Sequence, residues 1–364
     1  MNIPKLFSPG PVLVNSNVRC ALLHYDICHR SKEFEQLFQE TQSLIKSLFQ
    51  ADDSYYSVIV SGSGTSANET VLSSIFNTGD AVLLVKNGLF GERLEEIIDK
   101  YEIPKINASF TWGEYPDVAK VEQQIINNPQ IKVVAMVFHE TSTGMINPVK
   151  EIGRICKKYN KLFYVDCVSA AGGEFVDVVE NNISIATSVG GKCVGAFPGS
   201  AYVCAKESLL KSLTSTQCKN VYLSLQKHYQ SAITSHQTPN TPNVTLFWSL
   251  NIALKDIMEN GLENRITRYR RCAAIIREGV QKLGMRLLLS EYMSNTVTSV
   301  FLPEGIAVQP FLEEMERRGY VFYIGKGDYA KQNMIQIANM GEIYEQDCVN
   351  MLEVLKSCID AMRS

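Results

Sequence analysis

The sequence predicts an α/β protein with a large, mostly parallel β-sheet and a smaller α+β region towards the C-terminus. Short apolar runs alternate with amphipathic helical stretches through the middle of the chain, a pattern typical of α/β architecture. The apolar runs are continuous rather than alternating, which indicates strands that are covered on both faces and therefore pair mostly in parallel. After about residue 256 the regular alternation of strand and helix ends.

The predicted elements follow from these runs in chain order. In the first part we expect strands at residues 56–60, 81–85, 132–138, 162–166, 183–188 and 201–204, with helices at 65–76, 91–101 and 148–159. In the second part we expect strands at 297–302, 320–324 and 334–339, with helices at 309–318 and 344–362. We therefore predict a large α/β domain over residues 16–255 and a small α+β domain formed by residues 1–15 and 256–364.

Composition excludes several functional classes. The 364 residues carry 35 Lys and Arg against 38 Asp and Glu, a formal net charge of −3, so a nucleic-acid partner is not expected. No apolar run approaches the roughly 18–20 residues that span a bilayer, and residues 1–11 do not resemble a secretory signal. The ten cysteines are scattered without a CxxC pair, which favours a reducing cytoplasm and neither disulfides nor a metal site.

A glycine-rich turn, SGSGTSA at residues 61–67, lies between a predicted strand and a predicted helix. Glycines permit a tight turn, and the first N–H groups of the helix then form an anion site. Gly62, Gly64 and Ala67 also fit the G-x-G-x-x-A dinucleotide fingerprint, but that interpretation needs an acidic residue at the end of the next strand. That strand ends in Val85-Lys86-Asn87. The turn therefore favours a phosphate cradle over a dinucleotide site, with a plain strand–helix turn as the simplest alternative.

Asp166 and Lys192 form the second candidate constellation. Asp166 ends the apolar run 162–166, and Lys192 follows the next predicted strand. The carboxyl ends of strands in a doubly wound sheet converge on one ligand site. Pyridoxal phosphate requires this pair, because a lysine amine forms the Schiff base and moves protons while a carboxylate keeps the pyridinium nitrogen protonated. Alone, each residue has a simpler interpretation, Asp166 as a turn or cap residue and Lys192 as a solvated surface charge.

Several longer motifs carry a family resemblance. They are SPGP at residues 8–11, DICHRSKEF at 26–34, GSGT at 62–65, NGLFGER at 87–93 and HETSTGMINP at 139–148. These motifs resemble those of class V pyridoxal-phosphate-dependent aminotransferases, which have the aspartate-aminotransferase-like fold type I. Among them the chain is most similar to 2-aminoethylphosphonate–pyruvate transaminases, and HETSTGMINP is the most specific match.

The resemblance implies roles for individual residues. The phosphate of pyridoxal phosphate is expected at Ser63, Gly64 and Thr65, and the aromatic ring of Phe90 is expected to stack on the pyridine ring. Without its neighbours, Phe90 would be interpreted as core packing.

Two threonines complete the expected cofactor contacts. Thr143 is expected near the ring hydroxyl, although a loop threonine often caps its own backbone. The segment TPNTP at residues 238–242 resembles the stretch that reaches the phosphate of a second subunit, with Thr241 as the contact. The resemblance therefore implies a homodimer with shared active sites; an ordinary proline-rich turn is the alternative for this segment.

Two positions depart from the family pattern. Gln336 stands where an arginine usually binds the substrate carboxylate, and an amide carries no charge for that task. Gly191 replaces a commonly polar residue before Lys192. Arg30 and Lys326 are the basic residues that could compensate for Gln336, unless both are solvated surface charges. Substrate binding is therefore expected at Arg30, Lys326 and Gln336.

The expected activity is a ping-pong transamination through a Schiff base. A small phosphonate-bearing amine such as 2-aminoethylphosphonate gives its amino group to the cofactor, and an oxo acid then accepts it. Because Gln336 replaces the usual arginine, a pyridoxal-phosphate-dependent lyase or decarboxylase, or a transaminase with another small substrate, is the alternative. A cofactor-binding scaffold without activity is a third possibility, which the intact lysine, aspartate and phosphate turn disfavour.

Overall fold

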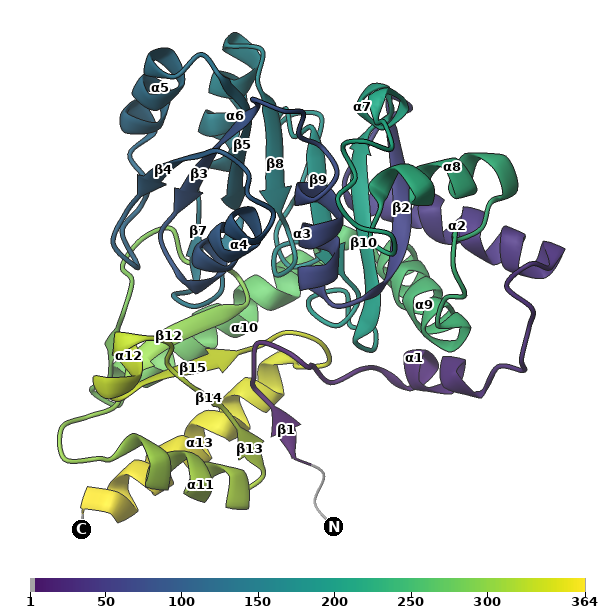
Figure 1. Ribbon diagram of the computed structural model, residues 1–364. Coiled ribbons are helices and arrows are strands. Elements are labelled where there is room, and N and C mark those ends of the chain that lie inside the picture. The colour runs from purple at the N-terminus through teal and green to yellow at the C-terminus, as the bar shows by residue number, and fades with distance from the viewer. Residues whose placement is uncertain (1–3, 364) are drawn as a thin grey trace.

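A seven-stranded sheet forms the centre of the computed structural model, which describes residues 4–363 (Figure 1). Its order is β2-β10-β9-β8-β5-β3-β4. The strands are β2 (Tyr55–Gly62), β3 (Ala81–Lys86), β4 (Lys105–Ser109), β5 (Ile131–Val137), β8 (Leu162–Asp166), β9 (Ile185–Val189) and β10 (Gly199–Lys206). The five strands from β9 to β4 pair in parallel, which confirms the predicted mostly parallel α/β sheet.

Strand β10 runs antiparallel to both of its neighbours, β9 and β2. The turn between β9 and β10 contains no helix that could carry the chain back across the sheet, so the chain returns directly beside β9. This reversal was not expected from the sequence, because β10 is as continuously apolar as its parallel neighbours.

Helices cover the large sheet, with α3 and α4 in front of it and α6 behind it in the view of Figure 1. Helices α2 and α9 pack on each other beside β2 and β10. This part of the chain contains α1 (Ser16–Cys20), a 3-10 turn (Ala21–Leu23), α2 (Lys32–Leu48), α3 (Gly64–Leu72), α4 (Leu89–Lys100), α5 (Val118–Asn127), α6 (Val149–Lys158), α7 (Glu207–Ser212), α8 (Leu225–Ser235) and α9 (Val244–Asn260). A short hairpin of β6 (His139–Glu140) and β7 (Met145–Ile146) follows β5.

A second, four-stranded antiparallel sheet lies below the first in Figure 1 and has the order β11-β12-β15-β14. Its elements and their partners are α10 (Leu262–Lys282), β11 (Arg286–Leu287), β12 (Val297–Phe301), α11 (Val308–Arg317), β13 (Tyr320–Val321), β14 (Tyr323–Ile324), α12 (Asp328–Lys331), β15 (Met334–Ala338) and α13 (Glu345–Arg363). An apolar core of its own joins this sheet to α10, α11 and α13.

The N-terminal segment belongs to this second layer. Strand β1 (Lys5–Leu6) pairs in parallel with β13, and the buried ring of Phe7 lies in the same core as Phe311 and Phe322. The division at residues 16 and 256 remains a prediction, and residues 1–3 and 364 of the predicted small domain lie outside the described part. Helix α10 contributes Leu262 and Ile266 to the core of the large sheet and Ile276 to the other core, so it links the two layers.

Two predicted elements end differently from expectation. The helix expected to Phe76 ends at Leu72, because the Ser73 carbonyl accepts a hydrogen bond from Lys219 N and the Ser74 hydroxyl accepts one from Leu225 N. The strand expected at 320–324 is divided at Phe322: β13 pairs with β1, whereas β14 pairs with β15. In both cases segments distant in sequence decide the boundary, which local periodicity does not reveal.

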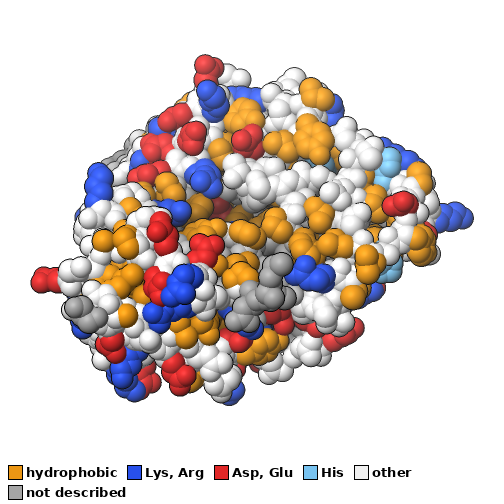
Figure 2. Space-filling model, turned by 90° about the horizontal axis from the view of Figure 1, so that it is seen from below, with side chains coloured by type: hydrophobic (Ala, Val, Ile, Leu, Met, Phe, Trp, Pro, Cys, Tyr) orange, Lys and Arg blue, Asp and Glu red, His pale blue; other side chains and the backbone are white. Residues whose placement is uncertain are grey.

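Basic and acidic side chains are interspersed on the face shown in Figure 2, with apolar side chains between them. Within residues 4–363, no helix is long and apolar enough to cross a membrane. The same residues contain no cluster of three or more His, Cys, Asp or Glu side chains able to hold a metal ion.

Candidate functional site

A cavity of about 260 Å³ lies at the carboxyl ends of the parallel strands. Six residues predicted from the sequence line it together: Ser63, Gly64, Thr65, Phe90, Asp166 and Lys192. The topology explains the convergence, because the segments after β2, β3, β8 and β9 all leave the sheet at this edge. Three further lining residues, to which the sequence analysis gave no individual role, matter below: Gly10, Asn68 and Arg93.

Lys192 lies just beyond β9 and is partly buried. Its Nζ donates a hydrogen bond to the carbonyl of Pro9, and the adjacent Gly10 forms the wall over the amine. Gly10 has φ +119°, a conformation that favours glycine, and a Cβ there would lie 2.6 Å from Nζ and displace the end of the lysine side chain. Burial lowers the pKa of Lys192, which favours the neutral, nucleophilic amine.

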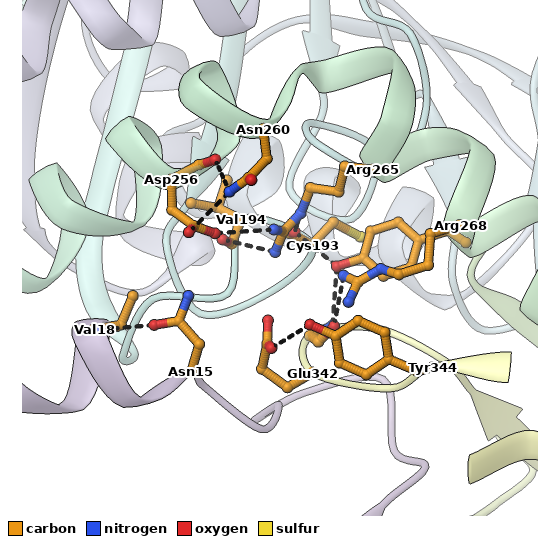
Figure 3. A network of polar contacts seen from close by, with 12 residues as sticks. Asn15, Val18, Cys193, Val194, Asp256, Asn260, Arg265, Arg268, Glu342 and Tyr344 are labelled. Carbon is orange, nitrogen blue, oxygen red and sulfur yellow. Dashed lines mark hydrogen bonds and ion pairs between the residues drawn. The ribbon is translucent and has the colours of Figure 1, made fainter. Parts of the chain in front are cut away.

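Helix α10 anchors the loop that carries Lys192 (Figure 3). Arg265 donates from Nε to the Cys193 carbonyl and from Nη2 to the Val194 carbonyl, both at 3.0 Å. Tyr269 donates its hydroxyl to the same Cys193 carbonyl at 3.0 Å. Three charge-assisted or buried hydrogen bonds therefore fix the backbone on the C-terminal side of the lysine.

Asp166 ends β8 and is 5% exposed. Its Oδ1 accepts from Val168 N at 2.8 Å and its Oδ2 from Asn68 Nδ2 at 2.6 Å. Burial raises the pKa of Asp166, while these hydrogen bonds and the positive charges of Arg93 and Lys192 act in the opposite direction. The carboxylate is thus placed in a buried site where a cationic partner would stabilise it.

The glycine-rich turn leads from β2 into α3, with Gly62 at φ +148° and Ser63 as the N-cap residue. The Ser63 side chain makes no capping hydrogen bond, so N–H groups of the first helical turn remain for an anion. A Cβ at Gly64 would lie 2.7 Å from Val168 Cγ2, beside the backbone that holds Asp166. The turn thus has the properties of a phosphate cradle.

The 139–148 motif positions the start of α4. The fully buried Glu140 carboxylate accepts from Phe90 N at 3.2 Å and from Gly91 N at 3.0 Å, the first turn of that helix. Ser142 Oγ also donates to Glu140 at 2.5 Å. Glu140 therefore determines where Phe90 lies against the cavity, a role that the motif match alone did not assign.

Arg93 follows Phe90 by one helical turn, and its Cζ lies 5.1 Å from the centroid of the Phe90 ring. It forms none of the ion pairs described between residues 4 and 363. The spacing of three residues could have indicated Arg93, since positions i and i+3 share one helix face. The cavity wall therefore carries a cation that is free to meet an anionic ligand.

Three other predicted residues do not line this cavity. Thr143 is buried, and its hydroxyl donates to the Glu140 carbonyl at 3.2 Å. It therefore caps nearby backbone, the simpler of the two interpretations given above for a loop threonine. Thr241 is exposed in its loop. The Arg30 guanidinium donates to Gln237 Oε1 at 2.7 Å, to the Thr238 carbonyl at 2.9 Å and to the Pro239 carbonyl at 3.3 Å. Arg30 therefore organises the segment that precedes Thr241, and the structure does not bring it to the cavity.

Gln336 and Lys326 lie on the small-sheet side of the molecule. Gln336 is buried in β15, and its Nε2 donates to the carbonyls of Thr141 at 2.7 Å and Ser142 at 3.2 Å. The amide is thus engaged in holding the 139–148 loop and does not line the cavity. Lys326 Nζ lies 5.2 Å from the Tyr323 ring, and its charge contributes to the lowered pKa of Lys192.

Packing explains the departure at Gly191. This residue lines the cavity, and a Cβ there would lie 2.9 Å from the Cα of Pro198. Any side chain at position 191 would displace the loop between β9 and β10, so glycine is required by the local backbone.

Comparisons with known proteins agree with this geometry. Residues 15–322 match the family model of the class V aminotransferases. The chain is 34% identical to an uncharacterised aminotransferase of Methanocaldococcus jannaschii, covering 95% of this chain and 90% of the relative. It is 30% identical to the 2-aminoethylphosphonate–pyruvate transaminase of Bacillus cytotoxicus, covering 96% of each chain. The crystal structure of ureidoglycine–glyoxylate aminotransferase from Bacillus subtilis superposes with a TM-score of 0.92 at 26% identity, covering 100% of this chain and 95% of that one.

Proposed function

The chain belongs to the class V aminotransferase family, and from this premise we propose that it transfers the amino group of a small phosphonate-bearing amine, such as 2-aminoethylphosphonate, to an oxo acid. The observation that carries the proposal is the convergence of Lys192, Asp166 and the glycine-rich turn on one cavity. The similarity to a phosphonate transaminase over nearly the whole chain supports the choice of amine.

The cofactor is pyridoxal 5′-phosphate, as in class V aminotransferases, and the residues present fit it. An amine, a buried carboxylate and an anion-binding helix start surround the same space, and these match the aldehyde, ring nitrogen and phosphate of that molecule. When bound, pyridoxal phosphate supplies a carbonyl carbon that takes up amines and a ring that accepts the electron pair released at the substrate carbon.

Within this proposal each residue has a defined task. Lys192 attaches the cofactor through Nζ and then moves the proton at the substrate carbon. Asp166 holds the proton on the ring nitrogen, Phe90 packs on the flat ring, and the backbone of Gly64 and Thr65 binds the phosphate. The wall formed by Pro9 and Gly10 limits the access of water to the amine.

Arg93 supports an anionic substrate. Its guanidinium lies on the cavity wall beside Phe90, forms none of the ion pairs described between residues 4 and 363, and adds to the positive charge that acts on Asp166. A phosphonate offers several acceptor oxygens to the planar N–H fork of an arginine. Because Gln336 carries no charge and its amide donates to two backbone carbonyls, we assign the phosphonate of the amine donor to Arg93.

A substrate panel tests the proposed function. Purified holoenzyme is assayed with 2-aminoethylphosphonate, uncharged amines and α-amino acids as donors, and with several oxo acids and aldehydes as acceptors. We expect stoichiometric formation of the aldehyde from 2-aminoethylphosphonate and of the amino acid from the acceptor. Release of phosphate or carbon dioxide without a matching aminated product would indicate lyase or decarboxylase chemistry and would contradict transamination.

The residue at position 336 is expected to affect which acceptors the enzyme uses, the second part of the substrate panel. A neutral amide in place of a guanidinium costs about 1–3 kcal/mol of carboxylate binding when nothing compensates, so we expect pyruvate to be a poor acceptor. We expect Gln336→Arg to improve kcat/KM for pyruvate by about tenfold or more, and the carbonyls of Thr141 and Ser142 can accept from the new guanidinium as well.

Gln336→Lys, which keeps N–H donors for the Thr141 and Ser142 carbonyls and adds a positive charge without the planar guanidinium, is the control for that substitution. Efficient use of pyruvate by the wild type, with no gain in Gln336→Arg, would show that position 336 is not a carboxylate site.

We further propose a homodimer in which Thr241 of one subunit contacts the phosphate of the other. The exposure of Thr241, and the three Arg30 hydrogen bonds that fix the preceding backbone, support this role. Sedimentation equilibrium is expected to give the mass of two chains. An active monomer would rule out the shared site, and Thr241→Val is expected to weaken cofactor binding without changing the fold.

A further inference from the structure

A buried polar network lies behind Asp166 and is centred on Asn68 in helix α3. Asn68 Nδ2 donates to Asp166 Oδ2 at 2.6 Å. Asn68 Oδ1 accepts from the Tyr164 hydroxyl and from the Thr187 hydroxyl, each at 2.8 Å. The four side chains are between 0% and 5% exposed, so water contributes little to the network.

The carboxylate and the two hydroxyl groups together account for both polar atoms of the Asn68 amide. Burial raises the pKa of Tyr164 well above its ordinary value, so the phenol keeps its proton and can donate. The Asp166 carboxylate can only accept, so the NH₂ group of Asn68 faces it, and Oδ1 is left to accept from Tyr164 and Thr187, whose hydroxyls also contact each other at 3.2 Å. An NH₂ group needs an acceptor, and a carboxylate is acceptor-only when it is ionised. The network is therefore complete when Asp166 carries its negative charge.

Asn68 has no evident purpose in the helix itself. Asparagine is a poor helix former, and the buried face of α3 is otherwise suited to apolar residues such as Ala67 and Val71. Asn68 also lines the cavity beside Asp166. A buried amide at this position is costly unless its hydrogen bonds are satisfied, and Asp166 is the partner that consumes its donor.

We propose that Asn68 is a positioning residue that holds the Asp166 carboxylate in one orientation and in its ionised form. This inference rests on the proposed function, in which Asp166 keeps the cofactor ring nitrogen protonated. Val168 N donates to the other carboxylate oxygen, so each oxygen of Asp166 has one fixed donor. Together, Asn68 and Val168 fix the orientation in which the carboxylate faces the cavity.

The other groups that face Asp166 do not take over this task. Arg93 and Lys192 are the positive charges that act on the carboxylate, and Tyr164 and Cys167 are the neighbouring titratable groups of its own strand end. Neither cation forms an ion pair with Asp166 among the pairs described for residues 4–363, whereas Asn68 makes direct contact. Removing the amide therefore removes a direct donor that favours the charged carboxylate.

The test compares Asn68→Ala and Asn68→Asp with Thr70→Val. Thr70 is a buried polar residue of the same helix whose hydroxyl donates to the Ser66 carbonyl, so Thr70→Val perturbs α3 without touching Asp166. The holoenzyme of each variant is dialysed against graded free pyridoxal phosphate, and bound cofactor is measured by visible absorbance across a range of pH. Steady-state kcat/KM is measured in parallel, and circular dichroism checks the fold.

We expect Asn68→Ala to weaken cofactor affinity by about tenfold, the size of one hydrogen bond to a charged group. Loss of a donor to the ionised carboxylate raises the pKa of Asp166, so the acid limb of the affinity profile should move about one pH unit higher. Asn68→Asp should shift it at least as far, because two adjacent carboxylates share a proton. Thr70→Val should leave both quantities at the wild-type values.

The outcomes separate this inference from the proposed function. A wild type that neither binds pyridoxal phosphate nor transaminates overturns the proposed function, and the assignment of Asn68 with it. A wild type that does both, with Asn68→Ala matching Thr70→Val in affinity and in the position of the acid limb, overturns the assignment of Asn68 alone. If Asn68→Asp fails to fold, Asn68→Ala decides the question, because alanine is the best helix former.

Discussion

Lys192→Ala is expected to abolish turnover while leaving the fold intact. The amine is the proposed point of cofactor attachment and the proposed proton carrier, so the substitution removes two functions at once. The structural loss is small, since Nζ donates a hydrogen bond to the Pro9 carbonyl at the edge of a cavity. The measurement is kcat with the best donor and acceptor pair, together with a thermal melt of both proteins.

Lys161→Ala is the matched control for this substitution. Lys161 Nζ also donates to backbone carbonyls, those of Pro129 and Ile131, but it precedes β8 and so lies at the opposite edge of the sheet from the cavity. It should keep wild-type turnover. Borohydride reduction of the wild-type holoenzyme followed by peptide mapping should label the peptide that contains Lys192. Label on a different lysine would show that this assignment is wrong.

Asp166→Asn is expected to lower kcat/KM by two to four orders of magnitude with a smaller loss of bound cofactor. Removing one partner of a buried ion pair costs about 3–5 kcal/mol, and each 1.36 kcal/mol corresponds to about a tenfold change in rate. The amide has nearly the same shape, so Val168 N can still donate to the retained oxygen of the side chain, but the new NH₂ group then faces the NH₂ group of Asn68. The amide cannot, however, keep a ring nitrogen protonated.

Asp177→Asn controls for the loss of an aspartate that accepts backbone hydrogen bonds. The Asp177 carboxylate accepts from Val179 N at 2.9 Å and Glu180 N at 2.7 Å and lies outside the cavity lining. This control should cost little activity. A rate in Asp166→Asn near that of the wild type, no lower than that of Asp177→Asn, would remove Asp166 from the chemistry and reduce its role to that of a turn residue.

The sequence predicted those parts of the site that depend on short segments. The glycine-rich turn, Asp166 and Lys192 each follow a continuous apolar strand, and the parallel order of those strands brings them to one edge. Phe90 was found through the family resemblance, and the structure adds that Glu140 holds its backbone. These residues were predictable from the local sequence because each lies directly next to the strand or helix that positions it.

Residues whose role depends on a distant partner were not predictable in this way. Gln336 was expected at the substrate, but its amide lies against Thr141 and Ser142, about two hundred residues earlier in the chain. Arg30 was expected to bind substrate and instead holds the backbone at Thr238. A hydrogen bond across such a separation leaves no periodicity in either segment. The reversal of β10 beside β9 was missed for a different reason, because β10 is as continuously buried as its parallel neighbours.

The pairing of β1 with β13 affects the order in which this protein can be completed during synthesis. Residues 5 and 6 are synthesised more than three hundred residues before their partner strand, which begins at Tyr320, and the Tyr323 hydroxyl that donates to the Gly10 carbonyl comes later still. At elongation rates of about 5–20 residues per second, the interval is roughly 15 to 60 s. The large sheet can assemble during this interval with Lys192 in place but without its covering wall. A nascent chain should therefore acquire a folded large sheet well before it acquires an enclosed amine.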